Sequence, residues 1–338
     1  MGPNRILVVN VNWLGDVLFS TPLIRALRQK FPDAYIACMV VPRCKEILTL
    51  NPHLDEVIIY DEGGRHKGLI GKFKIVSYLK SQGFDTAILL HRSFTRTLIV
   101  FLAGIGRRIG YYTKKRAALL TEAVEPPPED MHRVDVFLNL GKTLGINLKN
   151  RDYEFFISDE DRKNAGFILE NTGIGKTDRF VVINPGGNWA PKRWPVGKFA
   201  KLADELIKRF GLKVAITGSR RDIRLGEHVA SLMKEKPAVL CGKTTLRELA
   251  AVMEKAKVVI ANDSGPMHIS ISMTAKTAAL FGPTSPQITG PIGKGDFAVL
   301  REHGDCDIPC YKVACEYYKC MDAITVDGVL KAIHEFIR

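Results

Sequence analysis

Short apolar runs alternate with longer amphipathic stretches along the whole sequence, and this alternation constrains the fold more than any other feature. Short apolar runs bounded by polar segments are typical of buried strands, and the stretches between them have the periodicity of helices that cover a core. Repeated strand–helix units close into parallel sheets with helices on their faces. The sequence therefore predicts an α/β protein.

The alternation occurs in two series, which indicates two domains. In the first half, predicted strands cover 6–11, 34–41, 56–60 and 85–90, and predicted helices about 16–31, 69–82, 93–103 and 132–145. The second half has strands at 180–184, 213–217, 238–241, 258–262 and 277–281, and helices at about 196–210, 222–234, 245–256 and 266–274. Residues 146–179 are polar and irregular, so we place the link there. The 338 residues are long enough for two Rossmann-like domains facing each other across a cleft, 1–160 and 161–338, the second ending in a C-terminal helix.

Ligands of such folds bind beyond the carboxyl ends of the strands, where loops enter helices, and three loops there carry unusual residues. The first is N-V-N-W-L-G-D-V-L-F-S-T-P at 10–22, which places Asp16 near the start of a helix. A carboxylate there has two interpretations. It caps the helix, or it acts as a general base that removes a proton from a hydroxyl group of a substrate.

The second loop, 184–195, follows a predicted strand and precedes a predicted helix. Its backbone at Gly186 and Gly187, together with the helix start, could cradle a phosphate group. A purely structural loop accounts for the glycines and prolines but not for the neighbouring cations Lys192 and Arg193. We therefore expect a phosphate contact at this loop.

The third loop, N-D-S-G-P-M-H at 262–268, has the same position between a strand and a helix. Ser264 and Gly265 can offer a hydroxyl and amides to a phosphate, and Asp263 and His268 suit the hydroxyls of a sugar. Each of these residues taken alone could be a helix cap or a buried histidine. Three such loops at equivalent strand ends favour a binding site.

The chain is basic, and its charge is concentrated. The net charge is +13, and the span 65–116 alone carries +11, with twelve Lys and Arg residues and Asp85 as its one acid. Such a surface attracts nucleic acid, an anionic lipid surface or a phosphorylated substrate, unless it is only a solvated face. We do not expect nucleic acid, because aromatic residues are sparse in this span and no zinc-finger or RNP-type motif is present. No apolar run is long enough to span a bilayer and no signal peptide is recognised, which predicts a cytoplasmic protein.

Five motifs, in order along the chain, resemble those of the bacterial ADP-heptose:lipopolysaccharide heptosyltransferases: N-W-L-G-D at 12–16, S-T-P at 20–22, P-G-G-N-W-A-P-K-R-W-P at 185–195, N-D-S-G-P-M-H at 262–268 and G-P-T-S-P at 282–286. The K-R-W-P form is most similar to the heptosyltransferase II branch. The resemblance implies a GT-B fold whose first domain binds a lipid-linked acceptor and whose second binds a nucleotide sugar. It also implies inverting transfer of L-glycero-D-manno-heptose to the inner core of lipopolysaccharide, with no cofactor or bound metal required.

The resemblance assigns roles to residues of both domains. It implies that Asp16 is the general base and that Lys192 neutralises the donor diphosphate. The other donor contacts that it implies are those of Ser264 and Gly265 with the diphosphate, Asp263 and His268 with the heptose, Thr244 near adenine and Asp222 near the ribose. Gly186 and Gly187 stand where some relatives carry hydroxyl side chains, so backbone amides would bind phosphate there. From charge, we expect Arg65, Lys67, Arg92 and Arg96 to contact a lipid A–Kdo type acceptor at the anionic inner face of the cytoplasmic membrane.

Four of the seven cysteines lie close together in the sequence, at Cys306, Cys310, Cys315 and Cys320. They are reduced structural thiols, a zinc or iron–sulfur site, or disulfides. Disulfides are disfavoured in the cytosol, and the spacing lacks the close C-x₂-C pair of most zinc sites. A structural metal at these cysteines is therefore an open prediction.

Two other function classes stay open at this point. Another nucleotide-sugar transferase of cell-envelope glycan synthesis would keep the donor motifs with a different base or sugar. A non-catalytic nucleic-acid-binding protein would use the basic span and have no use for Asp16. The sequence does not distinguish Kdo from a first heptose as the acceptor sugar.

Overall fold

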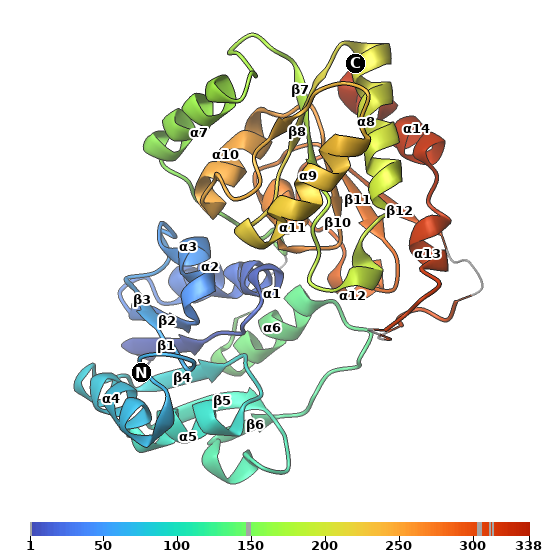
Figure 1. Cartoon of the computed structure of the whole chain (residues 1–338). Coiled ribbons are helices and arrows are strands. Elements are labelled where there is room, and N and C mark those ends of the chain that lie inside the picture. The colour runs from blue at the N-terminus through green and yellow to red at the C-terminus, as the bar shows by residue number, and fades with distance from the viewer. Residues whose placement is uncertain (1, 147–149, 303–305, 311, 313) are drawn as a thin grey trace. The chain divides into compact units, whose positions relative to one another are not determined.

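The computed structural model describes residues 2–146, 150–302, 306–310, 312 and 314–338. Over these residues the chain forms two compact units, Met1–Phe156 and Ile157–Arg338 (Figure 1). Each unit has its own six-stranded sheet in which all paired strands are parallel. The α/β fold expected from the alternation of apolar runs is confirmed.

The sheet of the first unit has the order β3-β2-β1-β4-β5-β6. Its strands are β1 (Arg5–Val9), β2 (Tyr35–Val40), β3 (Glu56–Ile59), β4 (Thr86–Leu89), β5 (Arg107–Tyr111) and β6 (Glu122–Val124). Its α-helices are α1 (Leu14–Phe19), α2 (Thr21–Lys30), α3 (Lys45–Leu48), α4 (Gly68–Ser81), α5 (Phe94–Leu102) and α6 (Arg133–Gly141), with 3₁₀ turns at Pro42–Cys44, Ala117–Leu119 and Lys142–Leu144. The direction of strand progression reverses between β1 and β4.

The sheet of the second unit has the order β12-β11-β10-β7-β8-β9 and reverses between β10 and β7. Its strands are β7 (Phe180–Asn184), β8 (Lys213–Ile216), β9 (Ala238–Val239), β10 (Val259–Asn262), β11 (Thr277–Phe281) and β12 (Phe297–Arg301). Its α-helices are α7 (Asp159–Asn171), α8 (Val196–Phe210), α9 (Ile223–Leu232), α10 (Leu246–Lys255), α11 (Gly265–Ser272), α12 (Pro286–Thr289), α13 (Lys319–Asp322) and α14 (Val326–Ile337), with 3₁₀ turns at Ala190–Lys192 and Arg220–Asp222.

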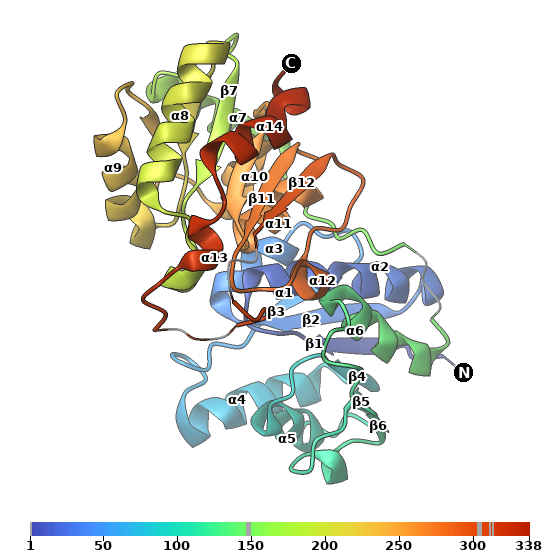
Figure 2. The same cartoon turned by 90° about the vertical axis from the view of Figure 1, so that its right-hand side faces the viewer.

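Helices cover both faces of each sheet, which explains why the central strands are apolar throughout rather than alternating. In the second unit α8 and α14 pack together on one face, and α10 and α11 pack together near β10 and β11 (Figure 2). In the first unit α4 and α5 share one buried cluster with the sheet, while α1, α2 and α6 contact one another. Among the helices described, none combines the length and the apolar character needed to cross a bilayer.

The structure differs from the sequence expectations at several elements. The single helix expected at 16–31 is two helices, α1 and α2, because the Ser20 hydroxyl donates to the carbonyl of Val17 and accepts from Asn10 Nδ2 at 2.7 Å. The stretch 146–179, expected to be irregular, contains α7, which begins with a capping box between Ser158 and Asp161. Strands β5, β6 and β12 differ from the expectations: polar residues mask β5 and β6 has three residues, whereas β12 is an apolar run outside the expected series.

Candidate functional site

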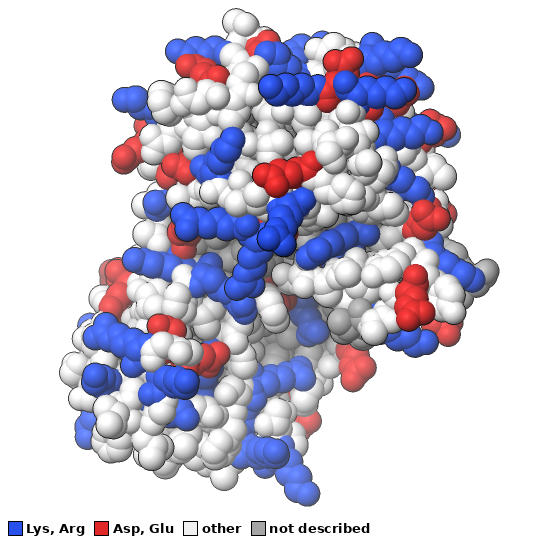
Figure 3. All heavy atoms as spheres, viewed as in Figure 1, with Lys and Arg blue, Asp and Glu red and all other residues white. Residues whose placement is uncertain are grey.

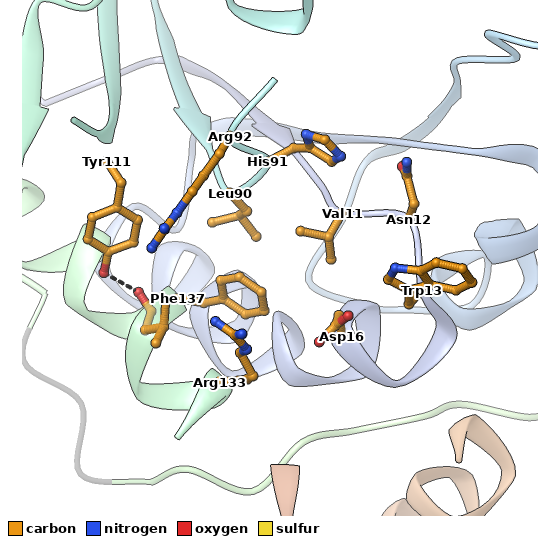
Figure 4. Close-up of a pocket in the computed structure, with 11 residues that line it drawn as sticks. Val11, Asn12, Trp13, Asp16, Leu90, His91, Arg92, Tyr111, Arg133 and Phe137 are labelled. Atoms are coloured by element: carbon orange, nitrogen blue, oxygen red, sulfur yellow. Dashed lines mark hydrogen bonds between the residues drawn. The ribbon is translucent and has the colours of Figure 1, made fainter. Parts of the chain in front are cut away.

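A pocket of about 340 Å³ opens in the first unit where the order of its strands reverses. Its walls come from the loop after β1, the loop after β4, the end of β5 and the first turns of α6 (Figure 4). Two adjacent parallel strands whose connections leave in opposite directions create a crevice beyond their carboxyl ends, which is the usual binding place of this architecture. The position of the pocket therefore follows from the topology.

Asp16 lies in the pocket and belongs to the first turn of α1. The N-cap residue of this helix is Trp13, so the alternative that Asp16 caps the helix is wrong. Figure 4 shows the Asp16 carboxylate and the Arg133 guanidinium extending into the same space. Acidic residues are common in the first turn of a helix, because the helix dipole is positive there.

Arg96, expected among the cations that meet an acceptor, is instead 2% exposed. Its guanidinium donates to the backbone carbonyl of Asn10 at 2.8 Å and to Asn12 Oδ1 at 2.7 Å, and it pairs with Glu62 at 3.3 Å. These contacts fix the loop between β1 and α1, which carries Asp16. Arg96 is a positioning residue in this structure, and its charge is not available to an acceptor.

The other three expected acceptor cations divide into two groups. Arg92 lines the pocket and lies over the Tyr111 ring at 5.4 Å, whereas Arg65 and Lys67 are exposed on the loop before α4 and do not line it. Sequence reasoning missed Arg133, the second arginine of the pocket, because it lies outside the basic span 65–116. The signal that could have found it is its position at a predicted helix start.

His91 is a neutral polar group in the wall of the same pocket. Burial lowers the pKa of its imidazole to about 4, and the Arg96 charge adds to this effect. The Nδ1 atom accepts a hydrogen bond from the Ser93 amide at 3.0 Å. The proton is therefore assigned to Nε2, which leaves one N–H donor for a ligand.

In the second unit, a buried asparagine ties together the loops that follow the two strands at the reversal point. Asn262, fully buried at the end of β10, donates through Nδ2 to the carbonyls of Pro185 and Gly186 at 2.9 and 3.0 Å. Its Oδ1 accepts from the Trp194 amide at 3.1 Å. These bonds hold the glycine loop after β7 against β10. The sequence pointed to this asparagine only as part of a motif.

Lys192 and Asp263 form an ion pair between these two loops, with 2.6 Å between Nζ and Oδ2. The same oxygen accepts from the Thr284 hydroxyl at 2.6 Å, and His268 Nε2 is 4.0 Å from Oδ1. Asp263 and His268 are buried, and the Lys192 side chain is 16% exposed. The sequence indicates each of these residues but not their pairing. Because Lys192 is already paired, an anionic ligand would compete with Asp263 for its ammonium group.

Ser264 occupies the N-cap position of α11 and does not cap it with its side chain. Its Oγ is buried and has no hydrogen-bond partner among the described residues. Leaving a buried hydroxyl without a partner costs free energy. A ligand that accepts a hydrogen bond from this hydroxyl therefore gains binding free energy. The amide of Gly265 lies in the first turn of α11, where helix amides have no partner within the helix and attract negative charge.

The remaining expected donor residues follow the next strands of the same sheet. A Cβ added to Gly186 would be 3.4 Å from the carboxyl of Asp222, so the glycine loop after β7 adjoins the 3₁₀ turn after β8. Thr244 is half-buried between β9 and α10. The loops thus lie along four consecutive strands, β10-β7-β8-β9, a span of about 14 Å. That length suits an extended nucleotide.

The cysteines near the C-terminus are all free thiols, as are the other three. Burial raises the pKa of the Cys320 thiol, with smaller contributions from Cys306 and Cys315. Within the described ranges, no cluster of three or more histidine, cysteine, aspartate or glutamate side chains is arranged to hold a metal ion. A metal at these cysteines stays a prediction that metal analysis of the purified protein tests.

Comparison with known proteins relates these features to a family. The sequence profile of glycosyltransferase family 9 (heptosyltransferase) matches residues 72–320. Lipooligosaccharide heptosyltransferase 2 of Haemophilus influenzae is 29% identical over 346 residues, which cover 98% of this chain and 99% of that protein.

Two solved structures are similar along their full length. The glycosyl transferase family 9 protein from Veillonella parvula is 29% identical with a TM-score of 0.91, over 99% of this chain and 97% of its own. ADP-heptose lps heptosyltransferase II of E. coli is 25% identical with a TM-score of 0.82, over 98% of both chains. Since the family profile covers most of the sequence and these structures share both sheets, the chain belongs to glycosyltransferase family 9, the heptosyltransferases, and is a glycosyltransferase of the GT-B fold.

Proposed function

We propose that this chain transfers L-glycero-D-manno-heptose from ADP-heptose to the inner core of lipopolysaccharide, with inversion at the anomeric carbon. The printed names of the Haemophilus influenzae and E. coli relatives support the donor and the acceptor. The observation that carries the proposal is the anion site of the second unit. There, a buried hydroxyl without a partner, a helix start and a lysine converge at the strand reversal.

The donor binds along the second sheet in this proposal. Its diphosphate accepts from Ser264, from the amide of Gly265 and from Lys192, and the backbone at Gly186 and Gly187 contributes further amides. Asp263 and His268 hold the hydroxyls of the heptose. Asp222 takes the ribose and Thr244 lies near adenine, in the order in which their strands follow one another. Fixed dipoles and one lysine stabilise the departing ADP by about 3 kcal/mol, which removes the need for a bound metal.

The acceptor binds in the first unit, where Asp16 removes the proton from the attacking hydroxyl. General-base catalysis of this kind contributes roughly 10²–10⁴ in rate. Arg92 and Arg133 flank the same pocket and pair with phosphates or acidic sugars of a lipid A–Kdo type acceptor. Neutral His91 adds a hydrogen bond without adding charge. Because the acceptor is lipid-linked, the enzyme works in the cytoplasm at the inner face of the cytoplasmic membrane.

Calorimetric titration with ADP, UDP, GDP and NAD tests the donor assignment. The proposal expects selective binding of ADP, weakened about tenfold in the variant Ser264→Ala, which removes only the hydroxyl. Selective binding of another nucleotide would be consistent with a glycosyltransferase but would assign it a different donor. A chain that binds no nucleotide would overturn the assignment of this site.

A further inference from the structure

The first turns of α4 expose three large apolar side chains to solvent. Leu69 is 81% exposed, Ile70 77% and Phe73 77%, more than the other large apolar residues of this unit. Exposed apolar residues are ordinary when they occur singly, but three together on one helix mark a surface that is covered in use. No other element described exposes three side chains of this kind to such an extent.

These side chains share one face of the helix. At about 3.6 residues per turn, positions 69, 70 and 73 lie together, on the side opposite to Gly71, Ile75 and Leu79. The latter three are buried against the sheet. The helix is therefore apolar on both faces at its N-terminal end, and packing within its own unit accounts for only one of them. Leu69, Ile70 and Phe73 are called the α4 apolar face below.

Basic side chains flank this face in the sequence, and residues 63–84 contain no acid. Lys72 and Lys74 flank Phe73 in the sequence, and Arg65 and Lys67 precede the helix on an exposed loop. In Figure 3 the surface over α4, at the lower left, shows Lys and Arg spheres among uncharged ones, with a few Asp and Glu spheres beside them. Long basic side chains at the rim of an apolar face can reach anionic groups while their stems lie on apolar surface.

The loop before α4 is held firmly against the helix. The carboxyl of Asp61 accepts from the amides of Gly64 and Arg65 at 3.0 and 3.2 Å, and His66 Nδ1 accepts from the Asp61 amide at 3.0 Å. A Cβ at Gly71 would be 2.5 Å from the backbone of His66, so the loop touches the helix there. Arg65 and Lys67 are thereby presented at the same end of α4 as its apolar face.

We propose that the α4 apolar face inserts into the headgroup region of an anionic phospholipid membrane, with Arg65, Lys67, Lys72 and Lys74 binding lipid phosphates. An amphipathic surface of this composition lies in the plane of a membrane interface. The proposal rests on the proposed function, because a lipid-linked acceptor brings the enzyme to that surface.

Two other occupants fit the observations less well. A second copy of this chain would bring one basic surface against another, in a protein whose net charge is +13. A nucleic acid would use the cations but would gain nothing from Leu69 and Ile70, since bases stack on aromatic rings. Only a lipid interface uses both the apolar and the basic part.

Co-sedimentation of the full chain with lipid vesicles tests the proposal. Vesicles of about one-third phosphatidylglycerol in phosphatidylcholine are compared with vesicles of phosphatidylcholine alone. The expected result is binding to the anionic vesicles, reduced at least tenfold in the variant Leu69→Ser/Ile70→Ser/Phe73→Ser. The variant Lys67→Glu/Lys72→Glu/Lys74→Glu is expected to lose binding to the anionic vesicles and the dependence of binding on salt.

Matched controls separate this surface from general changes of polarity and charge. Phe167→Ser removes a 67% exposed aromatic residue of α7, and Lys201→Glu/Lys208→Glu reverses two exposed charges of α8. Both controls are expected to bind vesicles like the unchanged chain. Unaltered ADP affinity and thermal unfolding of every variant show that each is folded.

Vesicle binding is measured in the absence of donor and acceptor, so the outcome does not depend on the proposed transfer reaction. Equal binding of the α4 variants and the unchanged chain overturns the inference. A change of molecular mass in solution in the serine variant, with vesicle binding unchanged, shows that a second copy covers this face. Transfer to a water-soluble, deacylated acceptor is expected to be the same in the serine variant and the unchanged enzyme. If neither the serine variant nor the unchanged enzyme transferred heptose to this acceptor, the proposed function would be contradicted instead.

Discussion

The two units have the same sheet order and place their candidate sites at the same topological position, yet the charges at those positions are arranged differently. In the first unit Asp16 shares an open pocket with two arginines, Arg92 and Arg133. In the second unit Lys192 and Asp263 already pair with each other at 2.6 Å. The scaffold thus fixes where a ligand binds, and the loop residues decide what it is.

The difference has a consequence for chemistry. A pocket that holds a carboxylate and two cations can bind a charged ligand through the cations while the carboxylate accepts a proton, as the acceptor role requires. A closed ion pair with a nearby unpartnered hydroxyl favours a ligand that brings its own negative charges, as a diphosphate does. The role of each site therefore depends on the side chains that surround its charged groups, and not on the strand order that the two units share. Four predictions test this contrast.

The largest expected effect is that of Asp16→Asn. Transfer is expected to fall at least about a hundredfold, the low end for loss of a general base, while ADP binding in the other unit stays the same. Steady-state rates and calorimetry measure the two quantities. The control Asp327→Asn also removes a first-turn carboxylate, from α14, and should leave the rate unchanged. Undiminished turnover in Asp16→Asn would leave Asp16 a structural residue.

Lys192→Ala is expected to weaken ADP binding roughly 10–100-fold through loss of a charged hydrogen bond. It should also lower the free energy of unfolding by about 1–3 kcal/mol, because Asp263 stays buried without its counter-ion. Asp263→Asn separates the two effects, since it removes the competing carboxylate and should not weaken ADP binding. Lys198→Ala, which breaks the Lys198–Asp322 pair of the same unit, is the matched control. Equal ADP affinity in Lys192→Ala and this control would exclude Lys192 from the phosphate site.

Arg133→Gln tests the cations of the first unit. The KM for the acceptor is expected to rise about tenfold, with the KM for the donor unchanged. Arg28→Gln, which breaks a surface pair with Asp55, is expected to change neither. A rise of the donor KM in Arg133→Gln would contradict the division of substrates between the units.

The smallest expected effect concerns His91 and pH. Its pKa is near its ordinary value of about 6.5 in the unfolded chain and about 4 in the folded one. The folded state therefore loses stability as pH falls from about 6.5 towards 4, since the unfolded chain takes up the proton first. Between pH 7 and 5 the unfolding free energy should fall by no more than about 2 kcal/mol through this group. Denaturant unfolding of His91→Gln is expected to show a shallower pH dependence than that of the exposed control His334→Gln; equal slopes would contradict it.

The strand pattern made much of this architecture predictable. Continuous apolar runs indicate the central strands, so the sequence alone places the loops after β1, β7 and β10 at strand ends. Strand β5 was missed because Arg107, Arg108 and Gly110 interrupt its apolar pattern. Helix α7 was missed because its surface is mostly polar. Local sequence therefore identified the buried elements and not the solvated ones.

Side-chain partners were harder to predict than positions. Nothing in the sequence distinguishes Arg96, whose guanidinium is buried against Asn10 and Asn12, from Arg92, which lines the pocket. The difference arises because the loop after β1 presents acceptors to one of them only. The Lys192–Asp263 pair likewise joins residues 71 positions apart and depends on the order of the strands.

The most direct test is incubation of the enzyme with ADP-heptose and lipopolysaccharide from a heptose-deficient strain, with the products analysed by mass spectrometry. The account predicts that one heptose is added, that ADP is released in equal amount, and that both depend on Asp16. Transfer from a different nucleotide sugar, or ADP release without a glycosylated product, would contradict it.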